Sequence, residues 1–269
     1  MAYEWIIDAL ENTWDETSRV VAALDDRQFA APTPCPGWSV RDVVSHLVGF
    51  ELMLAGEPLP PTPEIRPDYV KNDIGAINEG FVIERRGRSR DEVVSEFRHV
   101  TSAALERLRA LSDEQWDVVG WSPEGNAPYH RFMETRLLDS WIHLQDIRDA
   151  IAMPSDDHGV GEEVVLNRFE AALPYVVGKR AKAPEGTRVR LNISGRAARS
   201  TDVVVVDGRA RAAEAPGEPD VEITTPAALF WRRCAGRISA DSFLAASATD
   251  VRGDRQLARA IADGLAIMI

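Results

Sequence analysis

The stretch TPCPGWSVRDVVSHL, residues 33–47, passes from a turn into a helix within a few positions. Its two prolines and one glycine break the chain before Trp38. Ser39 is a good N-cap, and Asp42 follows three residues later, which makes a capping box with Asp in place of the usual Glu. The apolar residues after it recur at helical spacing. The sequence therefore predicts a helix that begins at Ser39 and ends near Gly56.

His46 interrupts the apolar part of this expected helix. An imidazole that faces the interior of a helical bundle needs a polar partner, because buried polar groups are almost always hydrogen-bonded. Asp42, one turn earlier, is a candidate to orient one of its ring nitrogens. The other nitrogen requires a partner from elsewhere in the chain.

A second stretch, DSWIHLQDI at residues 139–147, supplies such partners. Asp139 and His143 are four residues apart, so a helix places both on one face. A carboxylate and an imidazole at this spacing can share one cation. Asp146 is placed to orient His143. These residues, together with His46, predict a divalent metal site.

Two ordinary explanations compete with the metal site. A lone buried histidine is usually satisfied by a hydrogen bond to the protein. An Asp–His pair one turn apart is often a surface pair of small energetic value. The spacing alone leaves these explanations open.

The rest of the first 155 residues predicts more helices, broken by proline-rich and glycine-rich loops. Serine capping boxes mark two of the starts, with Glu92 and Gln115 at the third helical position. This pattern is typical of a helical bundle. The further expected helices are residues 4–24, 67–86, 90–111 and 131–150, with a short piece after Ser112.

Residues 160–269 have a different pattern, in which short alternating stretches follow a single helix. Asp207 and Gly208 form a strong turn signal after the second alternating stretch. The segment predicts a small α+β domain. The expected elements are helices at 162–177, 226–234 and 257–267, and strands at 187–193, 202–206 and 220–224.

The composition restricts the partners and the location. The net charge is -12 and the pI is near 5.0, which disfavours nucleic acid and gives no reason to expect a membrane surface. There are only two cysteines, and neither a signal peptide nor a membrane-spanning stretch is apparent. We expect a cytoplasmic protein. Only three of the 31 basic residues are lysine, which suggests a GC-rich coding sequence.

Two further residues are candidates for chemistry. Cys35, which precedes the expected helix start, could be a nucleophile, although a cysteine without an identified base is more often structural. Arg237 could bind an anionic substrate through its planar guanidinium. It could equally be a solvent-facing charge at the end of a helix. Cys234 is expected in the core.

Residues 33–47 resemble the N-terminal motif of the mycothiol-dependent maleylpyruvate isomerase family, and residues 139–147 resemble its second motif. Residues 230–237 are similar to part of its C-terminal domain. The family belongs to the wider DinB-like group of metal-binding bundles. The resemblance implies a DinB-like four-helix bundle over residues 1–155, followed by a small α+β domain over 160–269. It also implies an actinobacterial source.

The resemblance further implies a divalent metal, typically zinc, on His46, Asp139 and His143, and mycothiol as the thiol partner. The family usually has glutamate at the position of Asp139, so this chain departs from the pattern there. Three protein ligands leave an open position, where a thiol would lose its proton. The thiolate would attack a small electrophilic substrate, with Arg237 on a substrate carboxylate. This is the chemistry of an isomerase or a thiol S-transferase.

Two alternatives belong to other classes. A metal-dependent hydrolase would hold water at the open position and would need no thiol. A non-catalytic protein would bind a small ligand and use the bundle as a scaffold. Thiol-independent turnover favours the first, and absence of metal with a bound small molecule favours the second.

Overall fold

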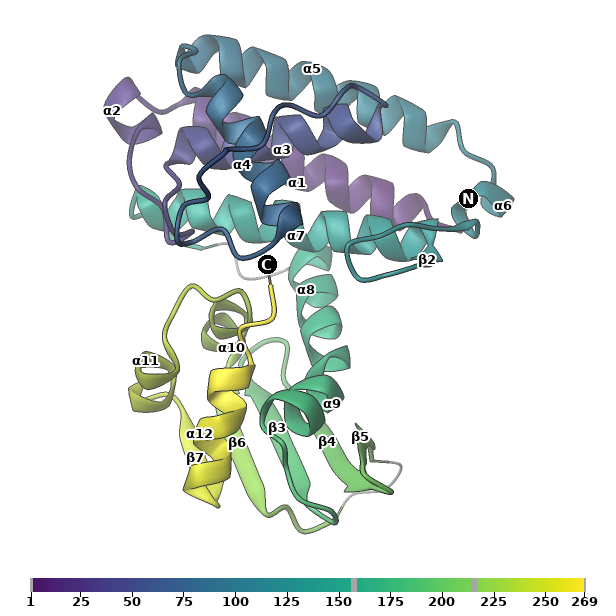
Figure 1. Cartoon of the computed structure of the whole chain (residues 1–269), viewed down its shortest axis with the longest axis vertical. Coiled ribbons are helices and arrows are strands. Elements are labelled where there is room, and N and C mark those ends of the chain that lie inside the picture. The colour runs from purple at the N-terminus through teal and green to yellow at the C-terminus, as the bar shows by residue number, and fades with distance from the viewer. Residues whose placement is uncertain (1, 156–158, 214–216, 269) are drawn as a thin grey trace. The chain divides into compact units, whose positions relative to one another are not determined.

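A computed structural model describes residues 2–155, 159–213 and 217–268. The chain divides into two compact units, Met1–Asp156 and Asp157–Ile269. Figure 1 shows that the first unit is built of helices and that the second contains a sheet. The fold class is α+β with an N-terminal helical bundle, as the sequence predicts.

Four long helices form the frame of the first unit. The helix α1 packs against α5 and α7, and α3 packs against the same two helices, while α4 packs against α3. The short elements α2, α6 and the β1–β2 ribbon connect them. The helices are α1 (Glu4–Ala22), α2 (Asp26–Phe29), α3 (Val40–Leu54), α4 (Asp73–Arg85), α5 (Arg90–Arg109), α6 (Asp113–Trp116) and α7 (Tyr129–Ala150), and the ribbon strands are β1 (Val119–Gly120) and β2 (Ala127–Pro128).

Side-chain caps set the helix starts. The expected capping boxes at the starts of α3, α5 and α6 are all present. The third expected helix is wrong at its start, because α4 begins at Asp73 and not near residue 67. The Asn72 side chain accepts a hydrogen bond from the Gly75 N–H and caps α4 there.

A close approach of two helices positions α3 in the bundle. A Cβ atom on Gly49 of α3 would lie 2.1 Å from the ring of Phe81 on α4. Only glycine leaves room for this ring. The contact fixes α3, which carries His46, against its outer neighbour.

The second unit combines helices with a sheet. In the part of the chain that the structure describes, five strands form the sheet in the order β5-β4-β3-β6-β7. The β3–β6 pair is parallel, and the other pairs are antiparallel. The elements are α8 (Val160–Ala171), α9 (Leu173–Tyr175), a π-helical turn η1 (Val176–Arg180), β3 (Arg188–Ser194), β4 (Arg199–Val206), β5 (Arg209–Ala212), β6 (Val221–Pro226), α10 (Ala227–Cys234), α11 (Ala240–Ala245), β7 (Asp250–Gly253) and α12 (Arg255–Gly264).

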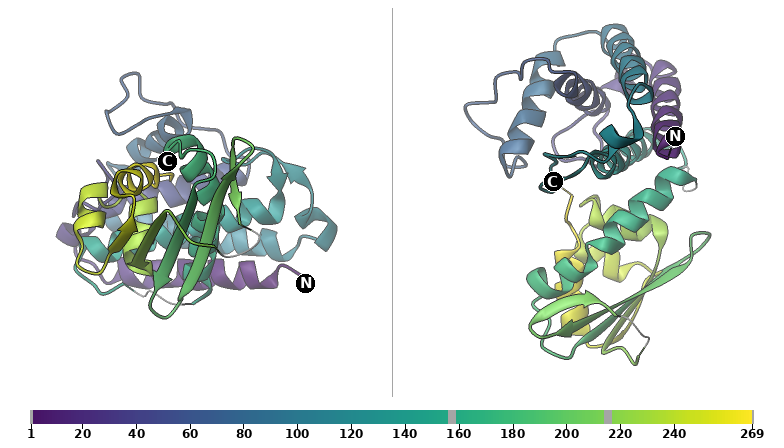
Figure 2. Two further views of the ribbon diagram at one scale, coloured as in Figure 1. Left: turned by 90° about the horizontal axis from the view of Figure 1, so that it is seen from below. Right: turned by 90° about the vertical axis from the view of Figure 1, so that its right-hand side faces the viewer.

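The helices of this unit cover one face of the sheet (Figure 2). Buried and half-buried residues alternate along β3 and β6, as a sheet with one covered face requires. Asp207 and Gly208 both have positive φ and form the predicted turn, which joins β4 to β5. The strands β5 and β7 and the helix α11 are additional to the predicted elements.

No helix among the described residues is both long enough and apolar enough to cross a membrane.

Candidate metal centre

Three side chains from two helices converge inside the bundle. His46 of α3 lies opposite Asp139 and His143 of α7, and one ligand atom from each lies within 4.8 Å of the others. His46 Nε2 is 3.2 Å from Asp139 Oδ2, and His143 Nε2 is 3.4 Å from Asp139 Oδ1. Both imidazoles are buried, and the carboxylate is partly exposed. The structure therefore brings together the three residues that the sequence singles out.

Asp146 holds the ring of His143. Its Oδ2 atom lies 3.0 Å from His143 Nδ1, which confirms the predicted contact. A carboxylate accepts hydrogen bonds, so Nδ1 carries the proton and Nε2 faces Asp139. Contacts of this kind fix the tautomer and the orientation of metal-binding histidines.

The predicted contact between Asp42 and His46 is wrong. Asp42 accepts hydrogen bonds from the backbone N–H and the hydroxyl of Ser39, and it also receives Arg86 Nε at 3.3 Å. Its carboxylate is therefore committed to the start of α3. Among the described residues, His46 Nδ1 is buried and has no hydrogen-bond partner.

The charges of the three residues act on one another. Burial raises the pKa of the Asp139 carboxyl, but His46 and His143 outweigh it and hold this pKa well below its usual value. Burial lowers the pKa of His46 by more than Asp139 raises it. Burial also lowers the pKa of His143, but the charges and hydrogen bonds of Asp139 and Asp146 raise it further. The centre thus keeps an ionised carboxylate beside a neutral His46.

A buried ion pair between Arg136 and Glu51 lies next to Asp139 and holds its carboxylate. Arg136 Nη1 donates to Asp139 Oδ2 at 2.6 Å, while its Nε and Nη2 atoms donate to Glu51 Oε1 at 3.2 and 2.8 Å. The sequence analysis missed this pair. Glu51 interrupts an apolar stretch, and Arg136 lies three residues before Asp139 on the same helical face. These signals mark each residue but do not show that the two are paired.

Trp38 closes one side of the centre. Its ring centroid lies 5.1 Å from that of His46 and 6.0 Å from that of His143. The indole Nε1 donates to Glu79 at 2.9 Å, which ties the ring to α4. Gly37 has a φ of 80°, and a Cβ atom there would lie 2.2 Å from the Tyr69 ring. The Pro-Gly-Trp sequence thus places an apolar ring over the two histidines.

The other candidate residues do not belong to the cluster of His46, Asp139 and His143. Cys35 is half-buried in the turn four residues before the N-cap Ser39, so the first turn of α3 does not begin at its thiol. Cys234 is fully buried, as predicted, and neither cysteine forms a disulfide. Arg237 belongs to the second unit, where its Nη1 donates to the Ala235 carbonyl at 2.8 Å. Its role in binding a substrate stays a prediction.

Comparison with protein families gives one match that covers half of the chain. Residues 10–148 match the model described as the mycothiol maleylpyruvate isomerase N-terminal domain. The matched segment contains His46, Asp139 and His143.

Known proteins provide more distant matches. Two uncharacterized proteins from two strains of Mycobacterium tuberculosis are each 24% identical over 141 residues, which is 52% of this chain and 53% of theirs. The chain thus spans about half the length of these curated relatives. The crystal structure of a mycothiol-dependent maleylpyruvate isomerase has a TM-score of 0.61 at 19% identity, covering 88% of this chain and 90% of that one. A histidine-to-alanine mutant of that isomerase has a TM-score of 0.59 at the same identity and coverage. At this identity the similarity shows a shared fold.

Proposed function

We propose, from the premise that this chain belongs to the mycothiol maleylpyruvate isomerase family, that it is a metal-dependent enzyme that uses mycothiol as its thiol cosubstrate. It would isomerise a small electrophilic substrate or transfer a thiol to it. The observation that carries this proposal is the convergence of His46, Asp139 and His143 within 4.8 Å. We further propose that residues 1–155 are the metal-binding domain, that residues 160–269 are a small α+β domain, and that the protein is cytoplasmic.

The donor set supports a divalent cation, and we propose zinc. Two imidazole nitrogens and one carboxylate oxygen are common zinc ligands, and a set of three leaves a position for a reactant. The ionised Asp139 and the neutral His46 are in the protonation states that a metal requires.

Each surrounding residue has a defined part in the proposed chemistry. A cation held by the three ligands would favour the thiolate form of an incoming thiol, which is the nucleophilic form. Asp146 keeps His143 in the tautomer whose Nε2 faces the centre. Arg136 holds the Asp139 carboxylate in place. Trp38 limits the access of water from its side.

Elemental analysis tests the metal centre. We expect about one zinc per chain in the purified protein, and loss of the metal in His46→Ala, because three ligands are few enough that removal of one disables the site. His99→Ala is the matched control, since His99 is an exposed histidine of α5, and it should keep its metal. Parent protein that takes up no zinc, even after incubation with the ion, contradicts the proposal.

Activity measurements then distinguish the possible reactions. Turnover of maleylpyruvate, or of another small electrophile, should require both mycothiol and the metal. Turnover of an ester or amide without any thiol would indicate a metal-dependent hydrolase instead. For Arg237, which we propose as the anchor of a substrate carboxylate, Arg237→Gln should raise KM and leave the metal content unchanged.

A further inference from the structure

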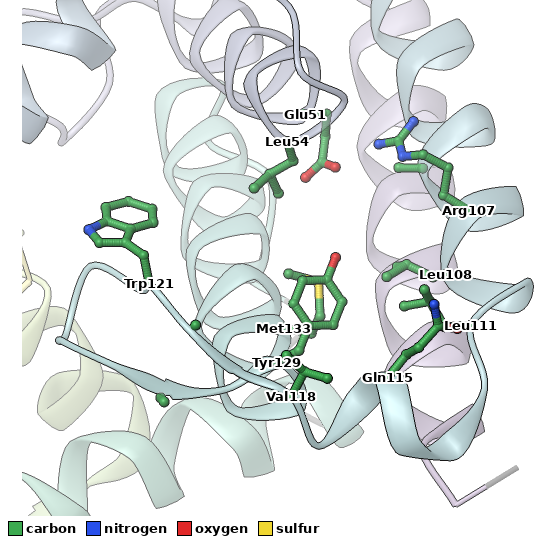
Figure 3. A pocket seen from close by; sticks show the side chains of 13 residues that line it. Glu51, Leu54, Arg107, Leu108, Leu111, Gln115, Val118, Trp121, Tyr129 and Met133 are labelled. Carbon is green, nitrogen blue, oxygen red and sulfur yellow. The ribbon is translucent and has the colours of Figure 1, made fainter.

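A pocket of about 410 Å³ lies inside the helical unit, beyond the metal centre. Figure 3 shows side chains entering it from the end of α3, from α5, from the β1–β2 ribbon and from the start of α7. Its volume falls in the range of roughly 300–1,000 Å³ that is usual for small-molecule sites. The residues that line this pocket lie outside residues 33–47 and 139–147, the two motifs by which the sequence resembles the family.

The walls of the pocket are mainly apolar. Leu54, Leu108 and Met133 line it from three helices, and Leu111 lines it just after the end of α5. Val118, at the ribbon, also lines it and is 60% exposed. Trp121, which also lines the pocket, is 56% exposed, and several exposed apolar side chains at one place are typical of a binding surface.

Two charged side chains face the pocket, and they differ in their partners. Glu51 is buried, and Arg136 already neutralises it through two hydrogen bonds. Arg107 is exposed, and among the described residues its guanidinium has no hydrogen bond or ion pair. Figure 3 shows Arg107 extending toward the pocket from α5. The uncompensated charge of the pocket is therefore positive, in a chain whose net charge is -12.

Tyr129 adds a neutral hydrogen-bond donor to the lining. Burial and then the charge of Glu51 raise the pKa of its hydroxyl, so the group stays protonated at neutral pH. Pockets of this kind combine apolar walls with a few polar groups that fix the orientation of a ligand.

The pocket is distinct from the metal centre but is connected to it. Glu51 follows His46 by five residues on α3, which is roughly 7.5 Å along the helix axis at 1.5 Å per residue. Arg136 bridges Glu51 and Asp139 through its two sets of hydrogen bonds. A ligand in contact with Glu51 would thus be linked to Asp139 through two ion pairs, Glu51–Arg136 and Arg136–Asp139.

We propose that this pocket binds a small carboxylic acid with an apolar body, such as a medium-chain fatty acid. The carboxylate would pair with Arg107 at the mouth, and the apolar body would lie among Leu54, Leu108 and Met133. A neutral molecule would leave Arg107 without a partner, and an amine would meet a Glu51 that is already neutralised. The site does not depend on the proposed metal chemistry.

Isothermal titration of the full-length, zinc-free protein with octanoate tests the proposal, with octanol as the neutral probe of equal length. We expect octanoate to bind more tightly than octanol. Arg107→Gln should weaken octanoate by about tenfold or more, since a hydrogen bond to a charged group is lost, and should leave octanol unchanged. Arg98→Gln is the matched control, an exposed arginine of the same helix that does not line the pocket.

A second pair of variants tests the mouth without touching the core. Val118 and Val119 are neighbours, both are exposed, and only Val118 lines the pocket. Val118→Glu should weaken octanoate binding by charge repulsion, and Val119→Glu should have little effect. Equal binding of octanoate and octanol, or equal loss in Arg107→Gln and Arg98→Gln, overturns the proposal. Octanoate binding that requires zinc and disappears in His46→Ala also overturns it, because the carboxylate would then bind at the metal centre.

Discussion

The short side chain of Asp139 contacts both Arg136 and the two histidines of the centre. Its Oδ2 atom accepts a hydrogen bond from Arg136 at 2.6 Å, while the same carboxylate faces His46 and His143. It is one methylene shorter than the glutamate that the family resemblance leads us to expect. The Arg136 contact fixes the carboxylate, and it would also compete with a cation for the negative charge of Asp139.

Replacement of Asp139 tests how much this shorter reach limits metal binding. Asp139→Glu should bind zinc as well as or better than the parent, because the longer side chain reaches further from α7. Asp139→Asn removes the charge, and its zinc affinity should fall by more than the 10- to 100-fold that is typical for loss of an outer partner. Competition with a chromophoric chelator measures both. Parent-like affinity in Asp139→Asn would show that the carboxylate is not a ligand.

At the residue scale, the sequence predicts the three converging side chains and the contact of Asp146 with His143, but not the Glu51–Arg136 pair. His46 and His143 stand out because each interrupts an apolar stretch, and the four-residue step links Asp139 to His143. The Glu51–Arg136 pair joins two helices that are distant in sequence. No local spacing can show such a pair until the register between α3 and α7 is known.

At the scale of single elements, the cap of α3 has a measurable value. The Ser39 hydroxyl accepts from the Asp42 N–H, and the Asp42 carboxylate accepts from the Ser39 N–H. Ser39→Ala should therefore lower the free energy of unfolding by about 1 kcal/mol. Urea denaturation of this variant and of Ser95→Ala, an exposed site within α5, provides the comparison. If the two substitutions change the free energy of unfolding equally, the cap does not stabilise the protein.

A cross-strand ion pair makes the sheet sensitive to acid. Arg190 of β3 and Asp202 of β4 are paired in register, with two hydrogen bonds of 2.7 and 2.8 Å. The hydrogen bond from Arg190 holds the pKa of Asp202 below its usual value of 3.8. A lowered pKa gives stability that is present above this usual value and is lost as pH falls through the folded-state pKa.

Asp202→Asn should accordingly lose up to about 1 kcal/mol at neutral pH, which is the usual scale of a cross-strand charge pair. It should lose less further stability on acidification than the parent does. Denaturant unfolding of the second unit at neutral pH and below 3.8 measures the difference. Asp15→Asn, at an exposed carboxylate of α1, should retain the acid sensitivity of the parent. Identical pH profiles in parent and Asp202→Asn would contradict this account.

The sequence predicts the elements that have a capping box or a long apolar face. It does not predict the edge strands, which form because a neighbouring strand pairs with them. The capping boxes and the long apolar faces located α1, α3, α5 and α7 to within a few residues. The edge strand β5 reads RARA and has no β-branched or aromatic residue, so its sequence does not favour a strand and it forms because β4 pairs with it. The edge strand β7 likewise depends on β6. The start of α4 differs from the prediction because Gly75, three residues after the Asn72 cap, has no side chain to complete a capping box.

At the scale of the whole molecule, removal of the metal should lower the stability of the first unit and leave that of the second unchanged. A ligand that binds only the folded state stabilises it by about 2.7 kcal/mol at 100 times its dissociation constant. Chelation of zinc should thus lower amide protection in α3 and α7, which carry the proposed ligands, and leave β3 and β6 unchanged. Hydrogen exchange with and without a chelator measures this. An equal loss in both units, or no loss in either, would contradict a metal centre confined to the bundle.

The pattern of polar and apolar residues is sufficient to predict the fold class of the whole molecule. The change from long apolar helices to short alternating strands near residue 159 predicted a bundle followed by an α+β unit. The strand order could not be predicted, because the parallel pairing of β3 with β6 joins segments about thirty residues apart, with β4 and β5 between them in the sequence.

That strand order has a consequence for synthesis on the ribosome. The contacts of the first unit close within the first 156 residues, so the bundle can form early. The central strand β3 gains its second neighbour only when residues 221–226 of β6 have emerged. At translation rates of about 5–20 residues per second, one edge of β3 stays open for a time on the order of seconds. During that interval the unpaired edge of β3 is the surface that a chaperone or a second nascent chain would meet first.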